Sequence, residues 1–137
     1  ASPLLEEQGR LETWIVLTKA DLAEEEVRVL TEVRSRPGKS AAIAVADLAA
    51  ATSIEERRVQ QVVKHLVERH QAPIGTATTP PFGYYWIVSD EERREVRDSL
   101  VRRAVSTLQR ARAYDRSGWV ARLIGQAELE LDGEARP

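Results

Sequence analysis

Apolar residues recur along the first half of the chain at the three-and-four spacing that places them on one face of a helix. Three such runs follow one another, and they predict helices over about 21–35, 45–51 and 54–70. Pro37-Gly38 breaks the pattern after the first run, and Thr52-Ser53 breaks it after the second. We therefore expect three helices that pack around one apolar core.

The pattern changes after residue 70. Apolar residues become continuous or alternate over 72–75 and again over 84–88, and the turn-rich segment TATTPPFG lies between them. Two short apolar runs joined by such a turn are typical of a β-hairpin. The predicted fold class is therefore mainly α with a small β-hairpin (α+β).

Helix starts are indicated at three places where an acidic residue follows Ser or Asp by three positions, the spacing of a capping box. The pairs are Asp21 with Glu24, Ser53 with Glu56 and Ser89 with Glu92. The last pair opens a helix over 89–116, which would be nearly 40 Å long at about 1.5 Å per residue. Because this is longer than a small core can cover, we expect its apolar stripe to meet a second element or a second chain, which favours a homodimer.

The two ends of the chain carry weaker patterns. Residues 1–20 form an N-terminal extension in which the apolar run TWIVL is compatible with a strand, although so short a run does not distinguish strand from helix. Residues 117–137 form a tail, and the apolar positions of 119–124 predict a short helix there.

The composition excludes several classes of site. The chain has no Cys, which removes disulfides and thiolate ligands, and its two histidines, His65 and His70, are five positions apart and so lie on no common helical face. We therefore expect no metal and no cofactor. No apolar run is long enough for a membrane helix, and residues 1–10 lack a signal pattern, so we expect a cytoplasmic protein without membrane contact.

Gly38-Lys39-Ser40 matches the end of a phosphate-binding Walker A loop. That loop needs a further glycine five positions earlier, where this chain has Val33, and it must follow a buried strand rather than a helix. The sequence also pairs no nucleophile with a base. We therefore predict that the protein is not an enzyme.

Two segments resemble a known family. VADLAAATSIEERRVQQVVKHLVE is similar to the bacterial helix-turn-helix core, and APIGTATTPPFGYYWIVSDEE resembles the wing of biotin-repressor-like regulators and of small phage-encoded winged-helix proteins. The resemblance covers about 21–114 and implies a winged helix-turn-helix domain over 21–88 followed by the long helix. The chain departs from the family at Thr52, where many members have glycine, and in the wing, which has no Lys or Arg between Gly75 and Tyr84.

The resemblance implies sequence-specific binding of double-stranded DNA, with the helix over 54–70 in the major groove. In projection, the polar side of this helix carries Arg57, Gln61, Lys64 and Glu68, flanked by Arg58 and His65. The candidate DNA-binding residues are Arg57, Arg58 and Gln61 for bases, and Lys64, Lys39 and Arg36 for phosphates. Residues 31–88 carry seven Lys and Arg against five Asp and Glu, so this part of the chain is slightly basic.

The family includes transcriptional regulators and phage or mobile-element factors, and the sequence does not separate these roles. Any exposed helix also has a polar face, so a purely solvated surface is the alternative for these residues. A third interpretation is a winged-helix module that binds another protein in a replication or transcription complex.

Overall fold

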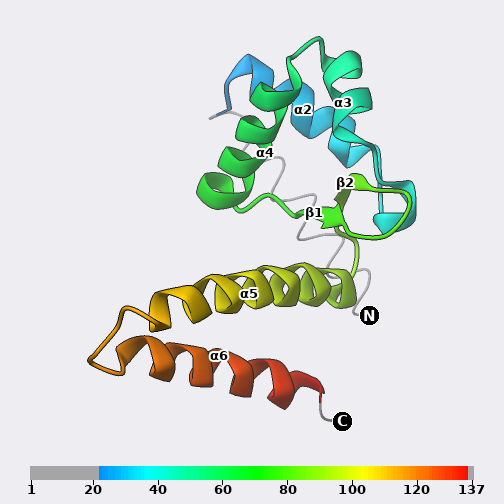
Figure 1. Cartoon of the computed structure of the whole chain (residues 1–137). Coiled ribbons are helices and arrows are strands. Elements are labelled where there is room, and N and C mark those ends of the chain that lie inside the picture. Colours follow the sequence, from blue (N-terminus) through cyan, green and yellow to red (C-terminus); the bar gives the residue numbers. More distant parts are fainter. Residues whose placement is uncertain (1–21, 136–137) are drawn as a thin grey trace. The chain divides into compact units, whose positions relative to one another are not determined.

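The structure, a computed structural model, describes residues 22–135 (Figure 1). Its elements in chain order are α2 (Glu24–Arg34), the 3₁₀ helix η2 (Lys39–Ala41), α3 (Val45–Thr52), α4 (Glu56–His70), β1 (Ile74–Ala77), β2 (Gly83–Trp86), α5 (Asp90–Arg112) and α6 (Trp119–Ala135). The expected fold class is confirmed: the described chain is mainly helical, with one two-stranded antiparallel sheet. Within that range, no helix combines the length and the apolar character needed to cross a membrane.

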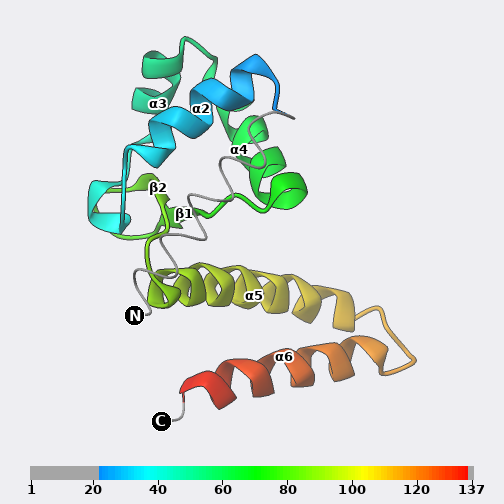
Figure 2. The ribbon, with the colours of Figure 1, turned by 180° about the vertical axis from the view of Figure 1, so that it is seen from behind.

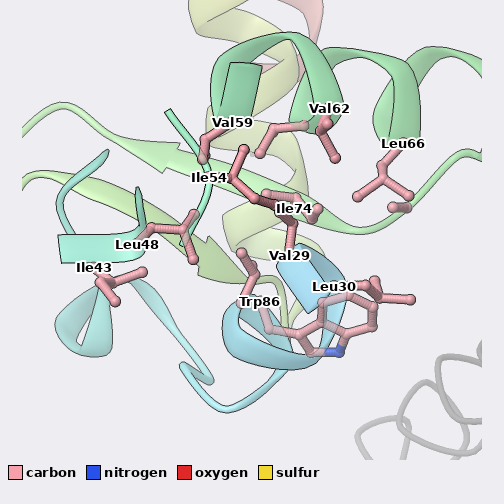
Figure 3. Packing of buried hydrophobic residues seen from close by; sticks show 13 residues of the cluster. Val29, Leu30, Ile43, Leu48, Ile54, Val59, Val62, Leu66, Ile74 and Trp86 are labelled. Carbon is pink, nitrogen blue, oxygen red and sulfur yellow. The ribbon is translucent and has the colours of Figure 1, made fainter. Parts of the chain in front are cut away.

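The chain divides into two compact units, one ending at Arg93 and the other beginning at Arg94. In the first unit, α2, α3 and α4 surround an apolar core that the hairpin completes (Figures 1 and 3). The buried cluster consists of Val29, Leu30, Val33, Ile43, Leu48, Ile54, Val59, Val62, Val63, Leu66, Ala72, Ile74 and Trp86. Each fully buried aliphatic side chain of this kind stabilises the fold by about 1.5–3 kcal/mol.

Strand β2 is paired along both of its edges. On one side it is antiparallel to β1, with Ile74 opposite Trp86 and Ala77 opposite Gly83. On the other side it bonds to the segment between α2 and α3: the amide of Ile43 donates to the carbonyl of Tyr84 (2.8 Å), and the amide of Tyr84 donates back (2.9 Å). The hairpin is thereby tied to the helices through backbone hydrogen bonds as well as through the core.

The helix starts agree with the capping prediction only in part. At α5 the amide of Glu92 donates to the Ser89 hydroxyl (3.2 Å), so the predicted cap is present. The reciprocal bond of a capping box is not formed, because the Glu92 carboxylate accepts from the amides of Val88 and Lys39. The prediction for Ser53 is wrong, because Ser53 has a left-handed backbone (φ 57°) and α4 begins at Glu56. Thr52 remains helical, and its hydroxyl donates to the carbonyl of Leu48 (2.7 Å). Asp21 lies outside the described residues, but the predicted pairing with Glu24 is wrong, because Ala23 is the N-cap of α2 and Glu24 is its first residue. The carboxylate that caps this helix belongs to Glu26, which accepts from the amide of Ala23 (3.1 Å).

The second unit contains most of α5 together with α6, which turns back along it in the ribbon view (Figure 1). None of the residues of α5 is buried, whereas α6 buries Val120 and Ile124. At 17 residues, α6 is longer than the short helix that the sequence predicts. The N-terminal extension over 1–20, with its expected strand, lies outside the described residues.

Candidate nucleic-acid interface

The apolar periodicity of α4 determines which of its side chains face outward. Val59, Val62 and Leu66 are at most 2% exposed because they pack in the core. Arg57, Gln61 and Lys64 project from the opposite side and are exposed. With the residues that the structure describes, these three side chains make no hydrogen bond or ion pair. We call Arg57, Gln61 and Lys64 the outward face of α4.

One further polar residue, Gln60, belongs beside this face. It is exposed and adjoins Gln61, and its amide can both donate and accept. The helical projection could have identified it, since Gln60 lies about 60° from Arg57 at 100° per residue. Acidic residues lie on or beside the same surface: Glu56 is in the first turn, and Glu68 is exposed one turn beyond Lys64 on the same side of the helix. The surface therefore carries charges of both signs.

Arg58 is oriented differently from Arg57. Its Nε lies 3.2 Å from Oε2 of Glu25, so it forms a hydrogen-bonded ion pair with α2. Both side chains are partly exposed, at 53% for Arg58 and 39% for Glu25. Arg58 is therefore partly neutralised at the flank that faces α2, while Arg57 is not.

The segment between α2 and α3 runs beside the hairpin (Figures 1 and 2). It carries the remaining two candidates, Arg36 and Lys39. The carbonyl of Arg36 accepts a hydrogen bond from the amide of Trp86 (2.7 Å). The amide of Lys39, at the start of η2, donates to Oε2 of Glu92 (2.9 Å). The structure thus brings Arg57, Gln61 and Lys64 together on one helix and keeps Arg36 and Lys39 at a separate place.

The connection between α3 and α4 is fixed by α2. Nη1 of Arg28 donates to the carbonyl of Thr52 (3.0 Å), which is the last residue of α3. The amide of Ile54 donates to the carbonyl of Ala49 (3.2 Å), and the Ile54 side chain is buried. This arrangement holds α4 at a defined position relative to α3, with its outward face exposed.

The aromatic residues of β2 serve mainly in packing. Tyr85 and Trp86 are 1% and 5% exposed, which leaves no ring face for a stacked base. Tyr84 is half-buried against the core, and burial raises its pKa above the ordinary value of 10.0. Aromatic side chains in this strand therefore do not form a stacking platform.

The structure brings the two histidines together at one end of α4. Their rings are in edge-to-face contact, with centroids 5.4 Å apart, and both approach the carboxylate of Glu26 from α2. The two histidines do not share a face by helical projection, but both lie near the end of α4. Glu26 of α2 lies close to both of them. No pattern within 54–70 could reveal Glu26, because it comes from a different helix.

Comparison with protein-family models, with curated proteins and with solved structures finds no significant match for this chain. The functional argument therefore depends on the residues themselves.

Proposed function

We propose that residues 21–88 form a winged helix-turn-helix domain, followed by a long C-terminal helix, and that the domain binds double-stranded DNA with α4 in the major groove. The observation that carries the proposal is the outward face of α4, where an arginine, a glutamine and a lysine are exposed without partners among the described residues. Arg and Lys pair with the guanine edge, and Gln pairs with adenine. The element order, three helices followed by a hairpin, agrees with this class of protein.

In this proposal the side chains divide into two roles. Arg57 and Gln61, near the start of α4, contact base edges, because early residues of a recognition helix reach deepest into the groove. Gln60, through its side-chain amide, adds a third side chain that can hydrogen-bond to bases beside Arg57 and Gln61. Lys64, together with Arg36 and Lys39 beside the hairpin, contacts phosphates and supplies affinity without sequence information.

We also propose that the protein is a homodimer through its second unit. Leu100, Trp119 and Leu129 are large apolar side chains that are 54%, 60% and 72% exposed on helices that otherwise carry many charges. A second copy would cover these side chains and present two copies of α4 to a DNA site with two half-sites. Sedimentation velocity at micromolar concentration should then give twice the mass of one chain.

The first test is selection from a pool of random duplexes by the full chain, followed by sequencing. An enriched motif that is lost in Arg57→Ala and Gln61→Ala would support base reading by α4. Arg102→Ala is the matched control, because Arg102 is also an exposed arginine and lies on α5. Enrichment that survives in all three variants would contradict the assignment to α4.

The dependence of affinity on salt provides a second test. About four phosphate contacts, from Lys64, Arg36, Lys39 and the helix ends, should give a slope near −3.6 for log affinity against log salt concentration. Such binding is compatible with a role in the cytoplasm as a regulator or as a phage or mobile-element factor. The genomic position of the DNA sequence found by selection would distinguish these roles.

One observation favours a second candidate, a module that binds another protein. The tip of the hairpin, Thr78–Phe82, is exposed and uncharged, and Phe82 is 58% exposed. A wing that binds the phosphates of DNA would carry Lys or Arg at the tip of the hairpin. If the selection gives no motif and binding shows no salt dependence, this surface becomes the proposed contact with a protein of a replication or transcription complex.

A further inference from the structure

Three metal-binding side chains from two helices meet at one point of the first unit. Oε2 of Glu26, in the first turn of α2, lies 3.5 Å from Nε2 of His65 and 3.7 Å from Nε2 of His70. One ligand atom from each of the three residues can be chosen so that all lie within 4.8 Å of one another. His65 and His70 are the only histidines of the chain.

The two oxygens of Glu26 have different surroundings. Oε1 accepts a hydrogen bond from the amide of Ala23 (3.1 Å) and so caps the start of α2. Oε2 is buried, and among the described residues it is the single buried side-chain polar atom without a hydrogen-bond partner. Its distances to the imidazoles are too long for hydrogen bonds. A buried carboxylate oxygen in this situation is costly unless a charge compensates it.

We propose that Glu26, His65 and His70 form a binding site for Zn²⁺. With bonds of about 2.0–2.1 Å, two ligands of a tetrahedral zinc ion are separated by about 3.4 Å, which is close to both oxygen-to-nitrogen distances in the cluster. Two imidazoles and one carboxylate are a common ligand set for this ion. The His65 side chain is 49% exposed, so a water molecule can complete the fourth position from solvent.

The site would connect parts of the fold that are distant in sequence. Glu26 belongs to the first turn of α2, and His70 is the last residue of α4. A bound ion would hold these helix ends together and compensate the buried carboxylate. It would also add positive charge next to Lys64, the neighbour of His65 in sequence. The site does not depend on DNA binding and can be tested without it.

The test uses the full chain without a histidine tag, stripped of metal with a chelator and then dialysed. Calorimetric titration with zinc chloride should give one ion per chain. At zinc concentrations a hundredfold above Kd, the melting temperature should rise by about 10 °C. Co²⁺ should bind competitively and give the visible absorption of a tetrahedral complex.

Two variants assign the ion to these residues. Glu26→Gln keeps an oxygen that can accept from Ala23 but removes the anionic ligand, and His65→Ala changes a half-exposed side chain. Each should weaken zinc binding by more than the roughly 10- to 100-fold that loss of an outer-shell partner costs. Glu24→Gln, an exposed neighbour in the same helical turn, is the control and should bind as the original chain does. Absence of zinc uptake up to 1 mM added ion, or unchanged affinity in Glu26→Gln, would overturn the proposal.

Discussion

The guanidinium of Arg58 and the carboxylate of Glu25 are 3.2 Å apart and join the start of α4 to α2. The preceding arginine, Arg57, has no such partner among the described residues. Two adjacent residues of the same type therefore have different environments. An arginine that already pairs with a carboxylate must give up that contact before it binds a phosphate or a base.

This difference predicts unequal effects of alanine substitution on DNA binding. Arg57→Ala should reduce affinity for the selected site by about 1–3 kcal/mol and relax the preference at one base pair. Arg58→Ala should have a smaller effect, and it should lower the free energy of unfolding by less than about 1 kcal/mol because the ion pair is exposed. Fluorescence anisotropy and urea denaturation measure the two quantities. Equal losses of affinity in both variants would show that Arg58 leaves Glu25 when DNA is bound.

A close backbone contact at Gly83 predicts a strongly destabilising substitution. Gly83 has φ 125°, and a Cβ atom there would clash with the carbonyl oxygen of Ile43. Gly83→Ala should therefore cost roughly 2–4 kcal/mol of unfolding free energy, measured by urea denaturation. The control is Gly125→Ala in α6, where a Cβ meets nothing within 4 Å. That substitution should stabilise α6 by about 1 kcal/mol. Similar stability of both variants would contradict the contact at Ile43.

The carboxylate of Glu92 accepts two backbone hydrogen bonds from different segments. Oε1 accepts from the amide of Val88 (3.0 Å), and Oε2 accepts from the amide of Lys39 (2.9 Å). Glu92→Ala leaves both amides to solvent and should cost about 2 kcal/mol of unfolding free energy, at about 1 kcal/mol for each bond. Ser89→Ala removes the cap at the same helix start and should cost about 1 kcal/mol. If Glu92→Ala costs no more than Ser89→Ala, the bond to Lys39 contributes nothing.

The start of α6 should be sensitive to acid through Asp115. Hydrogen bonds from the amide of Val120 and from Ser117 lower the pKa of Asp115 below its ordinary value of 3.8. The folded-state pKa is lowered, so this contribution to stability is complete above pH 3.8 and is lost as the pH falls through the lowered pKa. Carbon NMR titration of the carboxylate should show a midpoint below 3.8, and Asp115→Asn should remove this part of the acid dependence. A midpoint at or above the ordinary value would mean that the hydrogen bonds are absent in solution.

The sequence predicts those parts of the fold that a local period determines. The buried face of α4 is correct at Val59, Val62, Val63 and Leu66, since residues three and four apart lie on one side of any helix. The cap at Ser53 is wrong because that residue adopts a left-handed backbone, which the spacing to Glu56 does not reveal. The spacing of residues within one segment predicts the structure of that segment alone. The conformation of Ser53, in the turn between α3 and α4, depends on how the two helices pack.

Contacts between segments that are distant in sequence cannot be predicted from local spacing. Nothing in the hairpin sequence shows that Tyr84 pairs with Ile43, and nothing around His65 points to Glu26. The exposed side of α4 could be predicted, but the pairing of Arg58 with Glu25 could not, because it needs the position of α2. The candidate zinc site has the same origin: its ligands come from helices that only the tertiary structure brings together.

The pairing of β2 along both edges has a consequence for the dynamics of the first unit. The amides of Tyr84 and Trp86 donate to the carbonyls of Ile43 and Arg36, which lie 41 and 50 residues earlier in the chain. Solvent can reach these two amides only after the hairpin has separated from the segment between α2 and α3, which also opens the core around Trp86. Their native-state hydrogen exchange should therefore have the same free energy as complete unfolding of the unit, so that helices and hairpin open as one cooperative foldon.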